Sequence, residues 1–148
     1  MTFTVRQGAA LAAGGATALA IALAATLAAR GLWPAYAAAE PHKTYSVVMF
    51  VARLAIGALG TGVAAGVATR VAGDAGKAAW WLGGFFLALS LPLHLYVLWA
   101  DYPAWYHLIY LSYLVPIAGL AGRIMARPAP PATRRAGSGT AGSARLPR

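Results

Sequence analysis

Four long runs of apolar residues, separated by short polar segments, dominate the chain. They cover residues 8–29, 44–69, 78–100 and 104–122, and Arg53 is the one formally charged residue inside any of them. A helix that crosses the hydrocarbon core of a bilayer needs about 20 apolar residues, at a rise of about 1.5 Å each. Because backbone polar groups in lipid must be satisfied within their own segment, each run predicts a membrane-spanning helix.

The connections between the runs predict how these helices are arranged. Residues 101–103 form a very short turn, which makes the third and fourth helices antiparallel neighbours. The longer connection, residues 31–43, contains Pro34 and Pro41 and is interpreted as a loop, since proline limits helix extension. The predicted fold is all-α, an antiparallel bundle of four transmembrane helices at about residues 8–29, 44–70, 78–100 and 104–123, within a domain of residues 1–127.

The two ends of the chain require separate interpretation. Residues 128–148 consist of Pro, Ala, Gly, Ser, Thr and Arg with a single Leu. Such a segment cannot bury enough apolar surface to offset its ordering entropy, so we expect a disordered basic tail. The first run is too long for a signal peptide, whose core has about 7–15 residues. Arg30 also stands between this run and the possible cleavage site at residues 35–37, so we expect the run to be retained.

Composition supports a membrane protein. Hydrophobic residues make up 60% of the 148 residues and charged residues 10%, whereas a soluble domain carries about 25% charged residues. There is no cysteine, which excludes disulfides, thiolate metal sites, iron–sulfur clusters and covalently attached c-type haem. The formal net charge of +9 is concentrated in the flanks of the apolar runs. It therefore indicates basic membrane flanks, and we expect no nucleic-acid partner.

The distribution of cations predicts orientation. Arg6, Arg70, Lys77 and the six arginines from Arg123 onward belong to one side of a four-helix topology, and Arg30 and Lys43 belong to the other. Under the positive-inside rule both termini face the cytoplasm. The abundance of Ala, Gly and Arg suggests a GC-rich bacterial gene, and hence the bacterial inner membrane. An aromatic belt is then expected at the outer interface, at Trp33, Tyr36, Tyr45, Trp99, Tyr102, Trp105 and Tyr106.

Arg53 is the residue that most needs explanation. Counted from the start of its run it lies ~13 Å below the outer end. A charge at that depth costs at least ~2.5 kcal/mol and should meet a partner inside the bundle. The candidates at similar depth are all in the second half of the chain. We predict an outer-half polar cluster made of Arg53, His94, Asp101 and His107, with Tyr106 and Tyr110 nearby.

Three interpretations of this cluster stay open. It is a network that locks the helices, a site that handles a ligand or protons, or a pair of haem ligands. Haem fits least well, because rise arithmetic places His94 and His107 ~4–5 Å apart in depth. We expect no metal site, since two histidines and one distant carboxylate lack a metal-ligand spacing.

Small residues and prolines predict local packing. Ala58, Gly62 and Gly66 recur every four residues and give a smooth helix face. That face predicts close packing within the chain, for example against residues 8–29, or alternatively contact with a second copy. Pro92 and Pro116 are expected to kink the third and fourth helices.

Motifs of common enzymes are missing. The chain has no Walker loop, no HExxH and no GxSxG. We therefore predict a non-catalytic integral membrane protein without a cofactor, with an accessory or structural role. Its partners are the lipid bilayer and either another membrane protein or a second copy. The alternatives are a small transport or proton-linked component using Arg53, His94 and Asp101, and a haem-binding redox subunit.

One segment resembles a known family. Residues 94–122 read HLYVLWADYPAWYHLIYLSYLVPIAGLAG, with the pattern H-x4-W-x2-YP-x-WYHL-x-YL followed by proline and small residues. This pattern resembles uncharacterised small four-helix proteins of proteobacterial inner membranes. The resemblance covers about a fifth of the chain and implies fold and location, with no activity attached. It also makes residues 105–108 a better candidate for a purposeful site.

Overall fold

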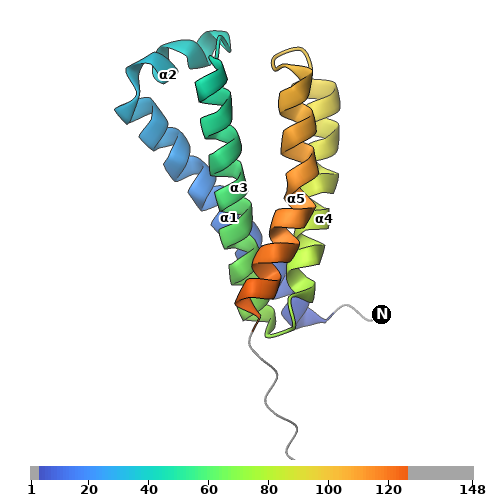
Figure 1. Ribbon diagram of the computed structural model, residues 1–148. Coiled ribbons are helices and arrows are strands. Elements are labelled where there is room, and N and C mark those ends of the chain that lie inside the picture. The colour runs from blue at the N-terminus through green and yellow to red at the C-terminus, as the bar shows by residue number, and fades with distance from the viewer. Residues whose placement is uncertain (1–3, 127–148) are drawn as a thin grey trace, which may run out of the picture.

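Four long helices make up the body of the protein, as the computed structural model of residues 4–126 shows (Figure 1). A short helix and a 3-10 turn, Glu40–His42, join the first two long helices, and a π-helical turn, Leu93–Val97, extends the third. The helices are α1 (Val5–Leu32), α2 (Pro34–Ala39), α3 (Val47–Ala72), α4 (Lys77–Pro92) and α5 (Ala104–Met125). Residues 4–126 contain no strand, which confirms the predicted all-α four-helix bundle. The predicted tail, residues 128–148, lies outside the described residues.

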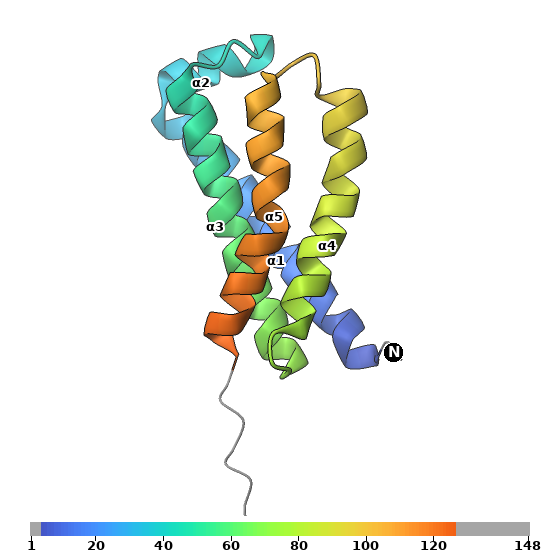
Figure 2. The ribbon, with the colours of Figure 1, turned by 45° about the vertical axis from the view of Figure 1, so that its right-hand side comes forward.

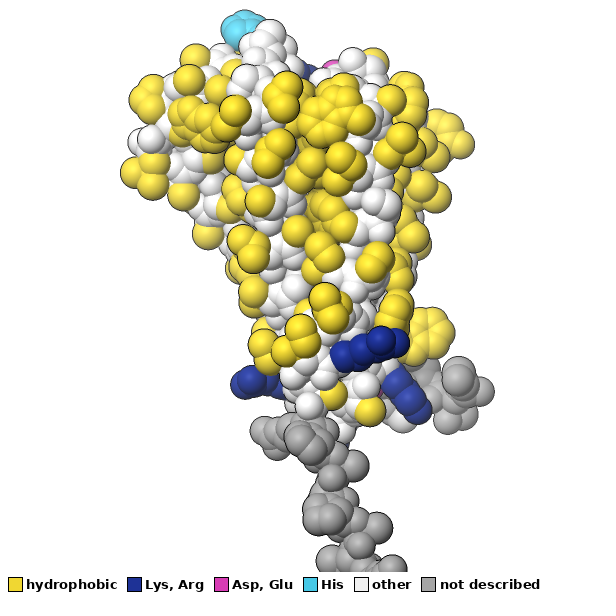
Figure 3. All heavy atoms as spheres, viewed as in Figure 1, with side chains coloured by type: hydrophobic (Ala, Val, Ile, Leu, Met, Phe, Trp, Pro, Cys, Tyr) yellow, Lys and Arg dark blue, Asp and Glu magenta, His cyan; other side chains and the backbone are white. Residues whose placement is uncertain are grey.

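The surface of the bundle is apolar over most of its length. Helices α1, α3 and α5, and α4 together with its π turn, are each long and apolar enough to cross a membrane. Large apolar side chains point outward, for example Leu27 (65% exposed), Leu59 (69%) and Ile124 (70%). In Figure 3 hydrophobic side chains cover the visible face down to its lower end, where Lys and Arg side chains gather. Such a surface suits lipid and not water, so the chain is a multi-pass membrane protein.

Polar caps and glycines set the ends of the middle helices. The hydroxyl of Ser46 accepts a hydrogen bond from the backbone N–H of Met49 and caps the start of α3. Gly73, with φ of 61°, ends α3 in the left-handed conformation. The carboxylate of Asp74 then accepts hydrogen bonds from the N–H groups of Gly76 and Ala78, at 3.0 and 2.9 Å, and caps α4.

Small residues hold the four helices together at the end of the bundle where α1 begins and α5 finishes, called here the alanine-rich end. Its buried core consists of Ala10, Ala64, Ala65, Ala68, Ala72, Ala78, Ala79, Leu82 and Ala118. The backbones of α4 and α5 lie very close, because a Cβ atom added at Gly83 would stand 2.9 Å from the Cβ of Ala118. Close approach of backbones through Gly and Ala is typical of membrane helices.

Bulky side chains fill the opposite end, called here the aromatic end. Two buried clusters lie there, one around Tyr36 and Met49 and one around Phe50, Leu54 and Tyr106. Figures 1 and 2 show α1 leaning away from α4 toward this end, with α2 lying across the tops of α1 and α3. Small side chains at one end and large ones at the other make the bundle a wedge.

Two sequence predictions need correction at the aromatic end. The connection of residues 31–43 is not a plain loop, because Pro34 occupies the first turn of α2, where a missing N–H costs nothing. The third helix does not reach residue 100. It leaves α-helical geometry after Pro92 and ends at Val97, since the proline cannot continue the normal hydrogen-bond ladder. Pro116, in contrast, lies inside an uninterrupted α5.

The predicted glycine face packs within the chain, as expected, but against a different helix. Added Cβ atoms would lie 3.7 Å from Ile117 at Gly62 and 3.2 Å from Met125 at Gly66, so this face meets α5. Ala58, one turn before Gly62, is half-buried. Helix α1 instead packs on the neighbouring face of α3, where Gly60 contacts Ile21. The alternative of a contact with a second copy stays a prediction.

Candidate functional site

A cavity of about 530 Å³ lies at the aromatic end between α1, α3 and α5. Its volume is within the range of about 300–1,000 Å³ that is typical of small-molecule sites. Alanines of α1 create the space, since they line a wall without filling it. The residues around the cavity are Ala22, Ala25, Thr26, Ala28, Ala29, Leu32, Trp33, Tyr36, Ala52, Arg53, Ile56, Gly57, Tyr106 and Tyr110.

A second cavity of about 290 Å³ continues from the first toward the middle of the bundle. The two share Ala22, Ile56, Gly57 and Tyr110 as lining residues, and the second reaches Phe86 of α4. Gly57 matters at the junction, because an added Cβ would collide with the hydroxyl of Tyr113. The walls of both cavities are mostly hydrocarbon.

Arg53 provides the charged end of the first cavity. Its Nη1 donates hydrogen bonds to the hydroxyls of Tyr36, at 2.5 Å, and Tyr45, at 3.4 Å. The guanidinium carbon also lies 4.9 Å from the ring centroid of Tyr45 and 5.6 Å from that of Tyr102, within cation–π range. Arg53 stands six residues after Val47, hence ~9 Å along α3, which is shallower than sequence arithmetic predicted. Residues 44–46 precede the helix, so tyrosines from the connection can reach the guanidinium.

None of the acidic side chains bonds to Arg53. The chain has three Asp and Glu residues, and all three lie within residues 4–126. Glu40 accepts a hydrogen bond from Arg30 at 2.5 Å, Asp101 pairs with Lys43, and Asp74 caps α4. The expected pairing of Arg53 with Asp101 is therefore replaced by tyrosine contacts.

The environment also shifts the acidity of groups in the connection. The hydrogen bond from Arg30 holds the pKa of Glu40 below its usual value. Burial raises the pKa of Tyr45 to about 12, although the neighbouring charge of Arg53 opposes this shift. Tyr45 therefore remains a neutral hydrogen-bond acceptor for Arg53 at physiological pH.

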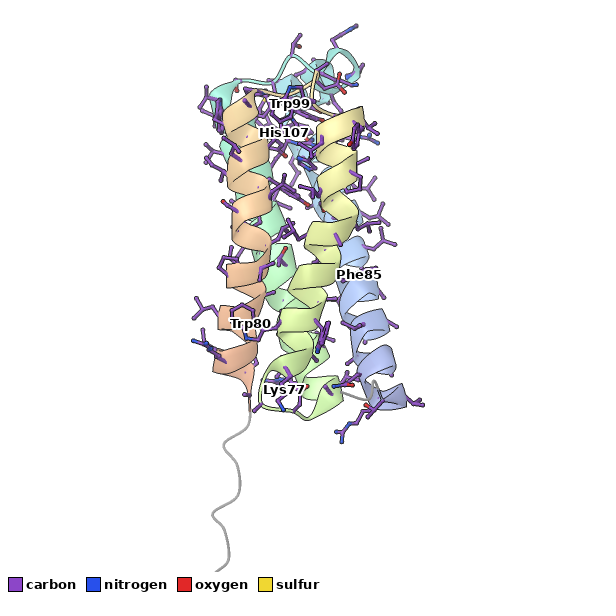
Figure 4. All side chains as sticks on the ribbon, turned by 90° about the vertical axis from the view of Figure 1, so that its right-hand side faces the viewer. Lys77, Trp80, Phe85, Trp99 and His107 are labelled. Carbon is purple, nitrogen blue, oxygen red and sulfur yellow. The ribbon has the colours of Figure 1, made fainter. Side chains whose placement is uncertain are left out.

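His94 and His107 form a buried pair between α5 and the π turn. Their Nδ1 atoms lie 2.9 Å apart, and the two rings are perpendicular. Tyr110 stacks on His94 with centroids 4.5 Å apart, and Trp99 stacks on His107 at 5.0 Å. Figure 4 shows Trp99 and His107 together at the upper end of the molecule, far from Trp80 and Lys77.

This pairing corrects the expected depth difference between the two histidines. The π turn after Pro92 departs from α-helical rise, so the arithmetic that separated them by ~4–5 Å does not apply. A hydrogen bond between two Nδ1 atoms requires one of them to carry a proton and the other to accept it. Among residues 4–126 no group of three or more metal-ligating side chains occurs.

The structure keeps most of the predicted polar cluster around Tyr106 and separates Asp101 from it. His94 and His107 pair with each other, with Tyr106 and Tyr110 against the His94 ring. Arg53 faces the cavity that Tyr106 and Tyr110 also line, and Tyr106 neighbours Arg53 as well as His94. Asp101 bonds instead to Lys43 in the loops. Tyr36, Tyr45 and Tyr102 are the partners of Arg53 that residue-by-residue reasoning missed. Their signal was the concentration of aromatic residues on one side of the predicted topology.

Comparisons with known proteins add no candidate activity. No protein-family model matches the chain, and no curated protein or solved structure is significantly similar to it. The resemblance carried by residues 94–122 thus stays a hypothesis.

Proposed function

We propose that this chain is a non-catalytic accessory protein of the bacterial inner membrane that holds a lipophilic ligand in its aromatic end. The observation that carries the proposal is the 530 Å³ cavity, with apolar walls and one polar end. Such a site has the usual composition of a binding pocket, mostly apolar with a few polar groups that orient the ligand. A partner in the membrane, either another protein or a second copy of this chain, would bind the complex of the chain with its ligand.

The polar lining of the cavity favours binding over catalysis. It consists of the Arg53 guanidinium, tyrosine hydroxyls, the Thr26 hydroxyl and the Trp33 indole. General acid–base chemistry at neutral pH is usually done by His, Asp, Glu or Lys with a suitable pKa. Within residues 4–126 no such side chain lines either cavity. The residues present can orient a ligand and exclude water.

Charge supports the proposed orientation. Arg6, Arg70, Lys77 and Arg123 lie at the alanine-rich end, against the single carboxylate of Asp74. At the aromatic end, the segments that flank the membrane spans hold two cations, Arg30 and Lys43. The positive-inside rule then favours a cytoplasmic alanine-rich end with both termini, and a cavity in the outer leaflet.

Mass spectrometry under native conditions tests the binding function. Wild-type protein purified from its own membranes in a mild detergent should retain a lipophilic molecule at one per chain. Ala25→Phe should lose it, because Ala25 lines the cavity. Ala24→Phe is the matched control, because its neighbour Ala24 is exposed and lines neither cavity. The absence of an adduct, or equal adducts in all three proteins, would reject the proposal.

A further inference from the structure

We propose that the ligand is a membrane amphiphile with an anionic head group, bound with its head on Arg53 and its hydrocarbon chain along the alanines of α1. This inference rests on the proposed function, which requires only that the ligand be lipophilic. It assigns the head-group charge, the residue that recognises it and the path of the chain.

The charge of Arg53 calls for an anion. The three carboxylates of the chain are all bonded elsewhere, and the tyrosines around Arg53 offer hydroxyl dipoles and ring faces only. Its Nε is buried and, among residues 4–126, has no hydrogen-bond partner. A buried charge is unfavourable unless it is paired and hydrogen-bonded. A phosphate or carboxylate in the cavity would supply an anionic partner to the part of the guanidinium that lines it, because guanidinium N–H groups favour such oxygens.

The shape of the cavities fits a hydrocarbon chain below that head. From Arg53 the first cavity passes Ala22, Ala25 and Ala29 of α1. The second continues past Ile56 to Phe86, deeper in the bundle. The walls along this path are apolar, so an acyl or isoprenoid chain would stay in hydrocarbon surroundings while its head contacts Arg53.

An entrance for such a molecule lies on the lipid side. Within residues 4–126, α4 contributes no residue to the wall of the first cavity. Figure 1 shows why, since α1 and α4 come together near the alanine-rich end and stand far apart at the aromatic end. An amphiphile can therefore slide in laterally from one leaflet, with its head kept at interface depth by the position of Arg53, ~9 Å along α3.

The test uses two lipids that differ only in head-group charge. Purified full-length protein in a neutral detergent is mixed with equimolar phosphatidylglycerol and phosphatidylcholine carrying the same chains, and complexes are counted by native mass spectrometry. We expect the wild type to prefer the anionic lipid by roughly tenfold, the effect of charge-assisted hydrogen bonds. Arg53→Gln should bind both lipids equally. Arg70→Gln, which removes an exposed cation at the other end, should keep the preference.

The outcomes separate the inference from the proposed function. Equal binding of both lipids by the wild type overturns the anionic head group and leaves the lipophilic site intact. A preference that survives in Arg53→Gln overturns the role of Arg53, and binding of neither lipid overturns site and function together. If Arg53→Gln does not fold, Ala25→Phe and Ala24→Phe test whether the anionic lipid binds in the cavity. Anionic lipid must be lost in the first and kept in the second, and equal retention overturns the site.

Discussion

The Nδ1 atom of His94 lies 2.9 Å from the Nδ1 atom of His107, in a site where His107 has no solvent exposure. This hydrogen bond links the π turn after α4 to the start of α5, so it helps to fix the aromatic end. Stacking of Tyr110 and Trp99 on the two imidazoles holds both rings in place. The pair therefore behaves as one structural unit.

We predict that the two histidines are energetically coupled, so that the double substitution destabilises the protein by less than the sum of the two single substitutions. His94→Leu or His107→Leu leaves the other imidazole buried without its partner, at about 1–3 kcal/mol. The double variant removes both polar groups, so its loss should be clearly smaller than the sum of the two. Circular dichroism melts in detergent measure the cycle, with His42→Leu, which changes an exposed histidine, as control. Additive losses, within ~0.5 kcal/mol, would show that the two rings are not coupled.

A second prediction concerns two adjacent glycines of α4. An added Cβ at Gly83 would stand 2.9 Å from Ala118 and 3.1 Å from the backbone of Val115, whereas nothing lies within 4 Å of one added at Gly84. Gly83→Ala should therefore destabilise the protein by about 1–3 kcal/mol through overpacking. Gly84→Ala should be neutral or stabilising, because Ala favours helix over Gly by up to ~1 kcal/mol. Equal melting temperatures for the two variants would contradict the close α4–α5 contact.

The overall fold could be predicted from the sequence because the four apolar runs leave few alternatives in a membrane. The ends of the helices were less predictable, since they depend on local caps. Ser46 places the start of α3 at Val47, three residues after the apolar run begins, and the segment that follows Pro92 forms a π turn. Both effects depend on local hydrogen bonds, which the hydropathy pattern does not predict.

The candidate site could be predicted only in part. His94, His107, Tyr106 and Tyr110 do lie together, because the short turn between the third and fourth helices makes them antiparallel neighbours. The partners of Arg53 were missed for two reasons. The connection before α3 folds back as α2 and brings the Tyr36 hydroxyl within hydrogen-bond distance of Arg53. Asp101 forms an ion pair with Lys43 and is therefore not available to Arg53. The position of a connecting segment relative to the bundle cannot be predicted from hydrophobic periodicity, because such a segment has no periodic pattern.

A third prediction concerns pH. The pKa of Glu40 is lowered by its hydrogen bond from Arg30, so the pair stabilises the fold fully above the ordinary value of 4.5. This contribution disappears as the pH falls through the lowered pKa, when the folded state takes up the proton too. Glu40→Gln should melt below the wild type at pH 7, and the gap should close in acid. The gap should be small, because Arg30 is 55% exposed.

The control for this pH effect is the partner residue. Arg30→Gln should show the same profile as Glu40→Gln, and combining the two should add little. A gap that widens below pH 4.5 would mean that the sign of the Glu40 shift is wrong. Comparing variants at the same pH removes the effects that all of them share.

The last prediction concerns which leaflet holds the cavity. The chain contains no cysteine, so a single introduced thiol reports its own location. Ala75 lies in the turn at the alanine-rich end and Ala100 in the turn at the aromatic end, and both are exposed. With a maleimide that cannot cross membranes, Ala100→Cys should react in intact spheroplasts and Ala75→Cys only after lysis. The reverse pattern would place Arg53 in the cytoplasmic leaflet, and its anionic ligand would then have to come from there. Reaction of both thiols in intact spheroplasts would reject the antiparallel topology itself, because residues 75 and 100 flank one membrane span.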